Sequence, residues 1–127
     1  EFGDLIQDLI QKQQLERSHQ LTIDDSVNWS LIASVVKMHT YRILQEAIMN
    51  IQKHAEASFV FIKFSLNESA KEIELIVKDD GKGFNKQKKP GIGLKNIKSR
   101  VYEVHGKISI DSKVGNGTKI SIFIPLK

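Results

Sequence analysis

Residues 58–83, SFVFIKFSLNESAKEIELIVKDDGKG, carry the pattern that decides the fold of this chain. Apolar side chains recur at every second position in residues 58–66 and again in residues 72–79. This alternation predicts two strands, each with one face on a core. The polar stretch Asn67-Glu68-Ser69 between them predicts a turn, so we expect the two strands to pair as a hairpin.

The flanking sequence predicts three helices and three further strands around this hairpin. We expect helices over residues 4–17, from a cap at Asn28 to about Ala55, and over residues 93–105. We expect strands over residues 20–23, 107–111 and 118–124. This order predicts an α+β fold, a two-layer sandwich in which a mixed sheet of about five strands carries three helices on one face.

The spacing of apolar residues in the helices indicates which side chains are buried. The expected buried residues are Leu5, Leu9 and Ile10 in the first helix, Leu44, Ile48, Ile51 and Ala55 in the second, and Leu94, Ile97, Val101 and Val104 in the third. Phe2 has no role in this interpretation.

Length and composition indicate one domain. The 127 residues are 40% hydrophobic and 27% charged, which is ordinary for a soluble globular protein. We expect residues 20–127 to form the domain, with residues 1–19 its first helix or the end of a linker. No apolar run approaches the ~18 residues of a membrane span, and no signal segment opens the sequence. Without cysteine, disulfides and thiolate zinc sites are excluded, which fits a cytoplasmic location.

Positive charge is concentrated in residues 78–100, which hold eight basic and two acidic residues, a net charge of +6 against +4 for the whole chain. Such a cluster attracts polyanions, although a solvated loop has the same composition. Nucleic acid is one candidate, but Phe84 is the only aromatic residue of this stretch that could stack on bases. A nucleoside triphosphate is the other, and the neighbouring glycines favour it.

Four polar residues of the long helix, Glu46, Asn50, Lys53 and His54, fall within an arc of roughly 100° in α-helical geometry. A carboxylate, an amide, an ammonium and an imidazole can together position a water, a metal ion and phosphate oxygens. One histidine in such a set makes a poor zinc site. A solvated helix face is the alternative interpretation.

Asp79 ends a strand face that is otherwise apolar, so its carboxylate is expected inside, where it needs a hydrogen-bonding partner. Gly81 and Gly83 follow, and the absence of side chains there would let a flat ligand approach. A carboxylate that only accepts hydrogen bonds suits the amino group of adenine. A structural Asp that caps the following turn is the alternative.

Two further segments indicate phosphate binding and a pocket wall. Residues 91–94, GIGL, lead into the last helix, whose first backbone N–H groups would form an anion site beside the lysines. A flexible loop is the alternative there. Thr118 shares a strand face with the isoleucines that follow it, so its hydroxyl points inward, unless it is β-branched core filler.

Taken in order, four segments resemble the ATP-binding domain of sensor histidine kinases, within the superfamily shared with DNA gyrase, mismatch-repair ATPases and heat-shock chaperone ATPases. The segments are YRILQEAIMNIQKHA at residues 41–55, DDGKGF at 79–84, GIGLKNIKSR at 91–100 and GT at 117–118. The resemblance covers roughly residues 20 to 127 and implies this family's ATP-binding fold.

The resemblance implies a role for each matching position. Asn50 would be a ligand of Mg²⁺, and Glu46 would orient or deprotonate the reacting group. Lys53 and His54 would lie near the phosphates, and Asp79 would accept a hydrogen bond from adenine. The remaining ATP-binding positions implied by the resemblance are Gly81, Gly83, Gly91, Ile92, Gly93, Leu94 and Thr118.

The chain departs from the family pattern in two respects. Only seven residues separate Gly83 from Gly91, so the lid over the nucleotide is short, and Lys89 and Lys95 are both candidates for the γ-phosphate contact. The family's phosphoryl-accepting histidine precedes an acidic or amide residue of the Asp, Glu or Asn kind. No histidine here does so, and we therefore expect no self-phosphorylation by the chain alone. The four histidines are His19, His39, His54 and His105.

The activity implied is that of a protein histidine kinase: transfer of the γ-phosphoryl of ATP·Mg²⁺ to a histidine on a separate dimerisation domain, which then passes it to a response regulator. We expect a monomeric, cytoplasmic fragment without nucleic-acid or membrane contact, from a homodimeric parent that is either soluble or membrane-anchored. The alternatives are a serine kinase that regulates a sigma factor and a nucleotide-binding module without catalysis. Lys53-His54 and the YRILQE lead-in favour the histidine kinase.

Overall fold

The computed structural model describes residues 2–13, 20–83 and 92–126. Its centre is a five-stranded sheet with the strand order β1-β2-β3-β5-β4. The strands are β1 (Gln20–Asp25), β2 (Phe59–Asn67), β3 (Glu72–Asp79), β4 (Lys107–Ser112) and β5 (Thr118–Pro125). Strands β1 and β2 are parallel and the other neighbours antiparallel, so the sheet is mixed.

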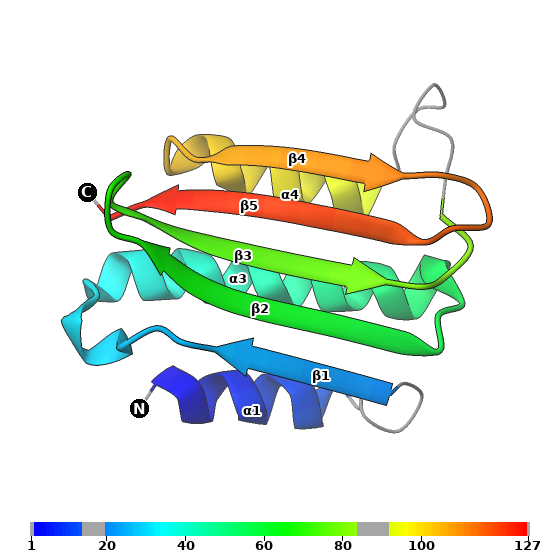
Figure 1. Cartoon of the computed structure of the whole chain (residues 1–127), viewed down its shortest axis with the longest axis horizontal. Helices are drawn as coiled ribbons and strands as arrows, with labels where there is room; N and C mark the ends of the chain where they lie inside the picture. Colours follow the sequence, from blue (N-terminus) through cyan, green and yellow to red (C-terminus); the bar gives the residue numbers. More distant parts are fainter. Residues whose placement is uncertain (1, 14–19, 84–91, 127) are drawn as a thin grey trace.

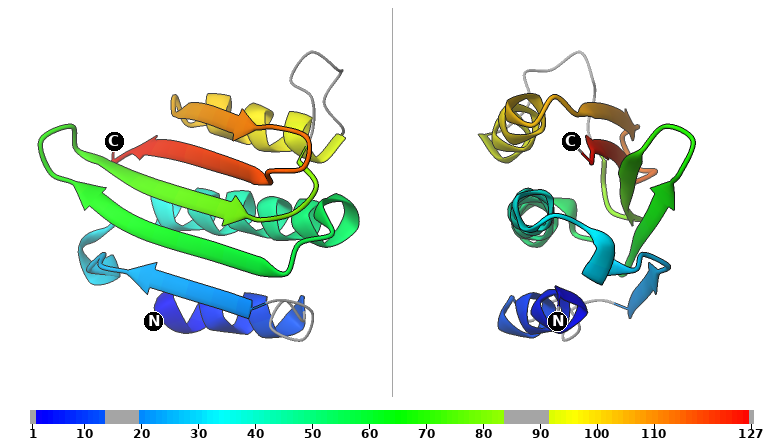
Figure 2. Two further views of the ribbon diagram at one scale, coloured as in Figure 1. Left: turned by 45° about the vertical axis from the view of Figure 1, so that its right-hand side comes forward. Right: turned by 90° about the vertical axis from the view of Figure 1, so that its left-hand side faces the viewer.

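Helices α1 (Phe2–Lys12), α3 (Ser34–Asn50) and α4 (Ile92–Glu103) form one layer against one face of this sheet (Figures 1 and 2). The other face of the sheet carries no helix among the described residues. The α+β two-layer sandwich, the hairpin β2–β3 and the edge strand β1 are therefore confirmed.

The alternation of apolar residues explains this layering. Inward positions of the three central strands are buried at Val60, Ile62, Phe64, Ile73, Leu75, Val77, Ile120, Ile122 and Ile124. They meet Ile43, Leu44, Ala47 and Ile48 of α3 and Ile97 and Val101 of α4. Fully burying one such side chain stabilises the fold by about 1.5–3 kcal/mol, so this interface accounts for most of the cohesion between the layers.

The long helix begins later than predicted. Asn28 does cap a helical segment, but this is the short 3₁₀ helix η1 (Trp29–Leu31), in which the Asn28 side chain accepts a hydrogen bond from Ser30 N at 3.3 Å. The N–H of Ile32 then bonds back to the Trp29 carbonyl and the chain becomes extended, so α3 starts only at Ser34. The prediction of one helix from Asn28 was wrong because the capped turn ends at Leu31 and extended residues separate it from α3.

The same helix also ends differently, because after Asn50 it continues as the π-helical turn η2 (Ile51–Ala55). A π turn advances fewer degrees per residue than an α-helix. The arc calculated for Lys53 from α-helical geometry is therefore displaced relative to Glu46 and Asn50.

Helix α1 buries Leu9 and Ile10 as predicted, but not Leu5. Its buried residues are Phe2, Ile6, Leu9 and Ile10, whereas Leu5 is 52% exposed. Phe2 packs on Trp29 with ring centroids 4.4 Å apart, and Trp29 meets Phe64 at 5.5 Å. This aromatic contact joins the start of α1 to the core, while Leu5 stays half exposed at the α3 side of the helix. Residues 14–17, predicted to continue the helix, lie outside the described residues.

Within residues 2–13, 20–83 and 92–126, no helix combines the length and the apolar character that crossing a bilayer requires.

We predict that Phe2→Ala lowers the free energy of unfolding by about 3 kcal/mol, because it removes a buried ring and its contact with Trp29. Phe59→Ala is the matched control, since Phe59 is 54% exposed, and should cost under about 1 kcal/mol. Urea unfolding followed by circular dichroism measures both. Equal losses would mean that α1 is not anchored through Phe2.

Candidate nucleotide site

Several elements end together at one edge of the sandwich. The carboxyl-terminal end of α3, the end of β3, the start of β5 and the amino-terminal end of α4 all lie on the right-hand side of Figure 1. Asn50 is the last residue of α3, Asp79 the last of β3 and Thr118 the first of β5. Residues predicted from separate segments for one ATP site are therefore brought to the same edge.

Asp79 lies on the inner, helix-facing side of β3. Its side chain is only 7% exposed and continues the buried row of that strand. Its Oδ1 accepts a hydrogen bond from Gly81 N at 2.8 Å, which caps the turn after the strand. The structural alternative left open by the sequence, an aspartate that caps the following turn, is thus present.

Thr118 is paired with Asp79 in the antiparallel register of β3 and β5. Its Oγ1 lies 2.8 Å from the Oγ of Ser112, a buried residue opposite it on β4. The Ser112 hydroxyl also donates to the Gly117 carbonyl at 3.1 Å. Ser112 was missed in the sequence, although it continues the inward alternation of Ile108 and Ile110. The Thr118 hydroxyl is therefore hydrogen-bonded to β4, on the side of β5 opposite Asp79, and is more than apolar core filler.

Asp80, the residue after Asp79, has a structural role. Oδ1 of Asp80 accepts hydrogen bonds from Ser58 N and Phe59 N, both at 2.8 Å. These bonds clamp the start of β2 to the end of β3. Asp80 therefore fixes the edge on which Asp79 sits, while its own side chain lies on the exposed side.

Two glycines are required by the backbone itself: Gly83 of the predicted site, and Gly117, which precedes Thr118. Gly117 has φ +80°, and a Cβ there would lie 2.1 Å from the Asp79 carbonyl oxygen. Gly83 has φ +63°, and its Cβ would lie 2.1 Å from the Lys113 carbonyl oxygen. The N–H of Gly115 also donates to the Lys82 carbonyl at 2.6 Å. The β4–β5 turn thus holds residues 81–83 in place, and the space beside these two glycines is filled by protein backbone.

The helical part of the site lies at the end of α3. Glu46 and Asn50 are half-buried and Lys53, in the π turn η2, is exposed. The side chain of His54 lies outside the described part of the structure. The π turn comes where the predicted phosphate contacts begin, and such turns are frequent at functional sites.

Helix α4 packs against α3 and begins at Ile92, with Leu94 buried and Lys95 exposed. Gly91 and Lys89 lie outside the described residues, as does most of the predicted lid. In the parts of the chain that are described, no group of three or more histidine, cysteine or acidic side chains is arranged to hold a metal ion. A cation bound at Asn50 would have to take most of its ligands from elsewhere.

A hollow of about 490 Å³ reaches the same element ends from the other side of the sheet. It is lined by outward side chains such as Phe61, Lys78 and Lys119 and by parts of Asp79. Because the Asp79 carboxylate belongs to the buried row of β3, this hollow is not the pocket predicted around it.

Residues 36–127 match the family described as "Histidine kinase-, DNA gyrase B-, and HSP90-like ATPase". The match spans well over half of the chain, and the chain belongs to this ATPase family. Its nucleotide is accordingly ATP.

The curated relatives are sensor histidine kinases. The chain is 40% identical over 93 residues to the signal transduction histidine-protein kinase/phosphatase DegS of Brevibacillus brevis, covering 72% of this chain and 24% of DegS. It is 30% identical over 115 residues to the sensor histidine kinase LiaS of Bacillus subtilis (strain 168), covering 89% of this chain and 31% of LiaS. The domain is thus of the type found in such kinases, and it spans about a quarter to a third of their length.

Solved structures show the same fold. The blue-light activated histidine kinase EL346 of Erythrobacter litoralis superposes with a TM-score of 0.82 at 17% identity, covering 98% of this chain and 42% of that one. The histidine kinase AdeS of Acinetobacter baumannii gives a TM-score of 0.76 at 15% identity, covering 99% and 65%.

We predict that Gly117→Ala destabilises the domain by at least about 2 kcal/mol more than Gly115→Ala does. Both glycines have positive φ, but a Cβ at Gly115 meets nothing within 4 Å whereas one at Gly117 meets Asp79. The difference between the two variants isolates the close approach of β5 to β3. Urea unfolding measures it, and equal losses would show that the approach imposes no constraint.

Proposed function

We propose that this domain binds ATP with Mg²⁺ and transfers the γ-phosphoryl group to a histidine on a separate helical domain. The observation that supports this most directly is the buried Asp79 carboxylate, paired in register with Thr118, at the same edge as the end of α3. Family membership and the histidine-kinase relatives support the reaction type.

At the base end of the nucleotide, Asp79 accepts a hydrogen bond from the adenine amino group, with Thr118 beside it. The Gly81 and Thr118 backbones frame this slot, because both are tied to Asp79 by a hydrogen bond or by strand pairing. The backbone N–H groups at the start of α4 point toward the phosphates and stabilise their negative charge. Leu94, buried in the core, anchors that helix end. Gly83, Gly91, Ile92 and Gly93 complete the contacts of the lid and its hinge.

At the phosphate end, the Asn50 side-chain oxygen suits Mg²⁺, a cation that prefers oxygen ligands and keeps several from water and phosphate. When bound, the ion would neutralise charge on the phosphate oxygens. Glu46, one helical turn earlier on α3, orients the attacking imidazole and takes its proton. Lys53 and His54 lie near the phosphates, and Lys89 or Lys95 contacts the γ-phosphate.

The acceptor histidine belongs to the dimerisation domain of the parent kinase, which passes the phosphoryl group to a response regulator. The fragment itself is monomeric and cytoplasmic. Nucleic acid is not its ligand, and no membrane contact is expected from it. A serine kinase of the same fold, or a module that binds nucleotide without catalysis, is distinguished by the labelling experiment below.

Asp79→Asn should weaken ATP and ADP alike. The substitution retains Oδ1 for the Gly81 N–H but turns the other acceptor into a donor against adenine. Losing such a bond costs about 1.5–3 kcal/mol, roughly ten- to hundred-fold in affinity. Asn50→Ala should instead abolish the gain that Mg²⁺ gives to ATP binding. Calorimetry with and without Mg²⁺ measures both, and unchanged ADP affinity in Asp79→Asn would contradict the adenine assignment.

The isolated chain should bind ATP yet remain unlabelled by radioactive γ-phosphate. Adding the acceptor domain of the parent kinase should give a label that is acid-labile and alkali-stable, as a phosphoramidate is. Yield should be low because the effective concentration of a tethered domain is lost. Glu46→Gln should abolish transfer without weakening ATP binding, whereas Glu103→Gln, an exposed residue of α4, should change neither. Acid-stable label on the acceptor would contradict the histidine-kinase assignment.

A further inference from the structure

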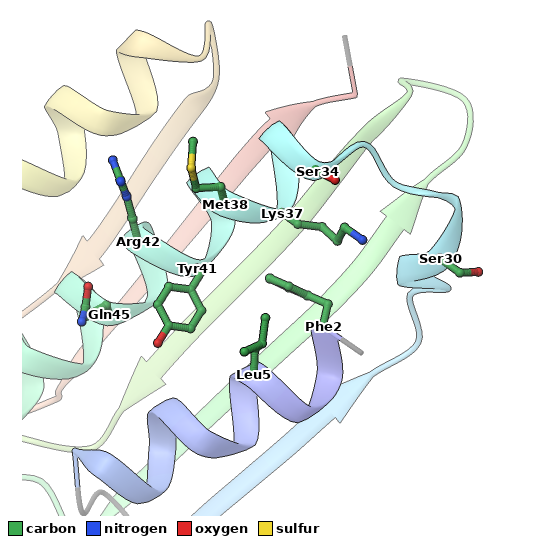
Figure 3. Close-up of a pocket in the computed structure, with 9 residues that line it drawn as sticks. All are labelled: Phe2, Leu5, Ser30, Ser34, Lys37, Met38, Tyr41, Arg42 and Gln45. Carbon is green, nitrogen blue, oxygen red and sulfur yellow. The ribbon is translucent and has the colours of Figure 1, made fainter.

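A groove with a cavity volume of about 740 Å³ runs between α1 and α3, on the flank of α3 away from α4. Figure 3 shows Phe2 and Leu5 pointing from α1 toward α3, and Tyr41 and Lys37 extending from α3 on the side of α1. None of the residues proposed for ATP lines it. We call it the α1/α3 groove, defined by Phe2, Leu5, Lys37, Met38, Tyr41 and Arg42.

The groove is apolar and exposed at once. Leu5 is 52% and Met38 43% exposed, although both belong to helices that bury their other side. The exposed apolar surface continues along the chain to Val35 (56%) and Leu31 (79%). Val35 and Met38 are three residues apart on α3, so their side chains are neighbours on that helix, whereas Leu31 belongs to the preceding turn η1. Contiguous apolar surface of this kind marks an interaction site.

The rim of the groove is positively charged. Lys37 and Arg42 line it, and none of the described residues that line it is acidic. Its remaining polar groups are uncharged hydroxyls and one amide, from Ser30, Ser34, Tyr41 and Gln45. An occupant that is apolar on one side and carries carboxylates along its edges would match both features. An elongated groove between two helices accepts an amphipathic helix with apolar residues three and four positions apart.

The far end of the groove adjoins the proposed transfer site. Arg42 and Glu46 are four residues apart on the continuous helix α3, about 6 Å along its axis and on neighbouring sides. A helix lying along Met38, Arg42 and Gln45 would therefore reach Glu46 without a change in the domain. The groove thus lies on one flank of α3, while Asn50 and the nucleotide end of the fold lie at its carboxyl-terminal end.

We propose that the α1/α3 groove docks an acid-flanked amphipathic helix of the domain that brings the phosphoryl-accepting histidine. This assignment of the occupant rests on the proposed function. The acceptor helix is the expected occupant because the groove lies one helical turn from Glu46, the proposed transfer residue. Docking there orients the acceptor along α3, so that its imidazole meets the γ-phosphate from the Glu46 side.

The test is transfer from this chain to the separate acceptor domain, with KM measured for the acceptor and for ATP. Met38→Asp and the double variant Lys37→Glu/Arg42→Glu should each raise the KM for the acceptor at least about tenfold. The KM for ATP should stay within about twofold, because none of these side chains is placed at the nucleotide. An unchanged KM for the acceptor in both variants overturns the proposal.

Matched controls lie elsewhere on the surface. Tyr102→Asp changes an exposed large hydrophobic residue of α4, 68% exposed against 43% for Met38, and Lys107→Glu/Lys119→Glu reverses two charges on the open face of the sheet. Both should leave the KM for the acceptor unchanged, and an increase equal to that of the groove variants would assign the effect to net charge and overturn the proposal. Circular dichroism verifies that every variant is folded.

If the proposed function is wrong, the unsubstituted chain transfers no phosphoryl group, and this result differs from a failure of the docking proposal. Docking is then measured by the methyl signals of the chain's two methionines as the acceptor domain is added. Docking in the groove is supported if the Met38 signal shifts and the affinity obtained from that shift falls at least about tenfold in Lys37→Glu/Arg42→Glu. If the Met38 signal does not shift, the proposal is overturned. A lipid surface is the alternative occupant, tested by sedimentation with vesicles of equal amounts of phosphatidylglycerol and phosphatidylcholine. If the groove variants no longer sediment with the vesicles but bind the acceptor domain as before, the groove is assigned to a lipid surface instead.

Discussion

The antiparallel pairing of β3 with β5 is the constraint on which the rest of this structure depends. It aligns the inward rows of two central strands, so that Ile73, Leu75 and Val77 meet Ile120, Ile122 and Ile124 under the helices. The same register sets Asp79 opposite Thr118. A slip of one residue would expose the whole row and turn Asp79 to the open face. Gly117 permits the register, because only a residue without Cβ allows the Asp79 carbonyl to come so close.

Much of the fold could be predicted from the sequence because apolar residues recur at every second position of β2, β3 and β5 and the core faces only one side. The helices were harder to predict, since their boundaries depend on local capping and π turns that the apolar spacing does not encode. In α1, Leu9 and Ile10 are buried as predicted, but the sequence did not show that Phe2 packs on Trp29 or that Leu5 is exposed. The start of α3 follows from a capped 3₁₀ turn, and its π-helical end has no signal in the apolar spacing.

The site residues were predicted as separate signals, and the topology brings Asn50, Asp79 and Thr118 to one edge. Their tasks within the fold could not be predicted, because these depend on strand register. Ser112 holds the Thr118 hydroxyl, and Asp80 clamps β2 rather than facing the pocket. Helix α3 links the two surfaces of the domain: it carries the proposed transfer residues at its end and the α1/α3 groove along its flank. A nucleotide and a protein partner can therefore be positioned by one rigid element.

We propose that the ends of α3, β3, β5 and α4 form one ATP site on the helix-facing side of the sheet. Amide chemical shifts recorded while a non-hydrolysable ATP analogue and Mg²⁺ are added test this site most directly. We expect the largest changes at Asn50, Asp79, Gly81 and Thr118, with little change at Phe61, Lys78 and Lys119 on the open face. The reverse distribution would place the nucleotide on the other side of the sheet and overturn this assignment.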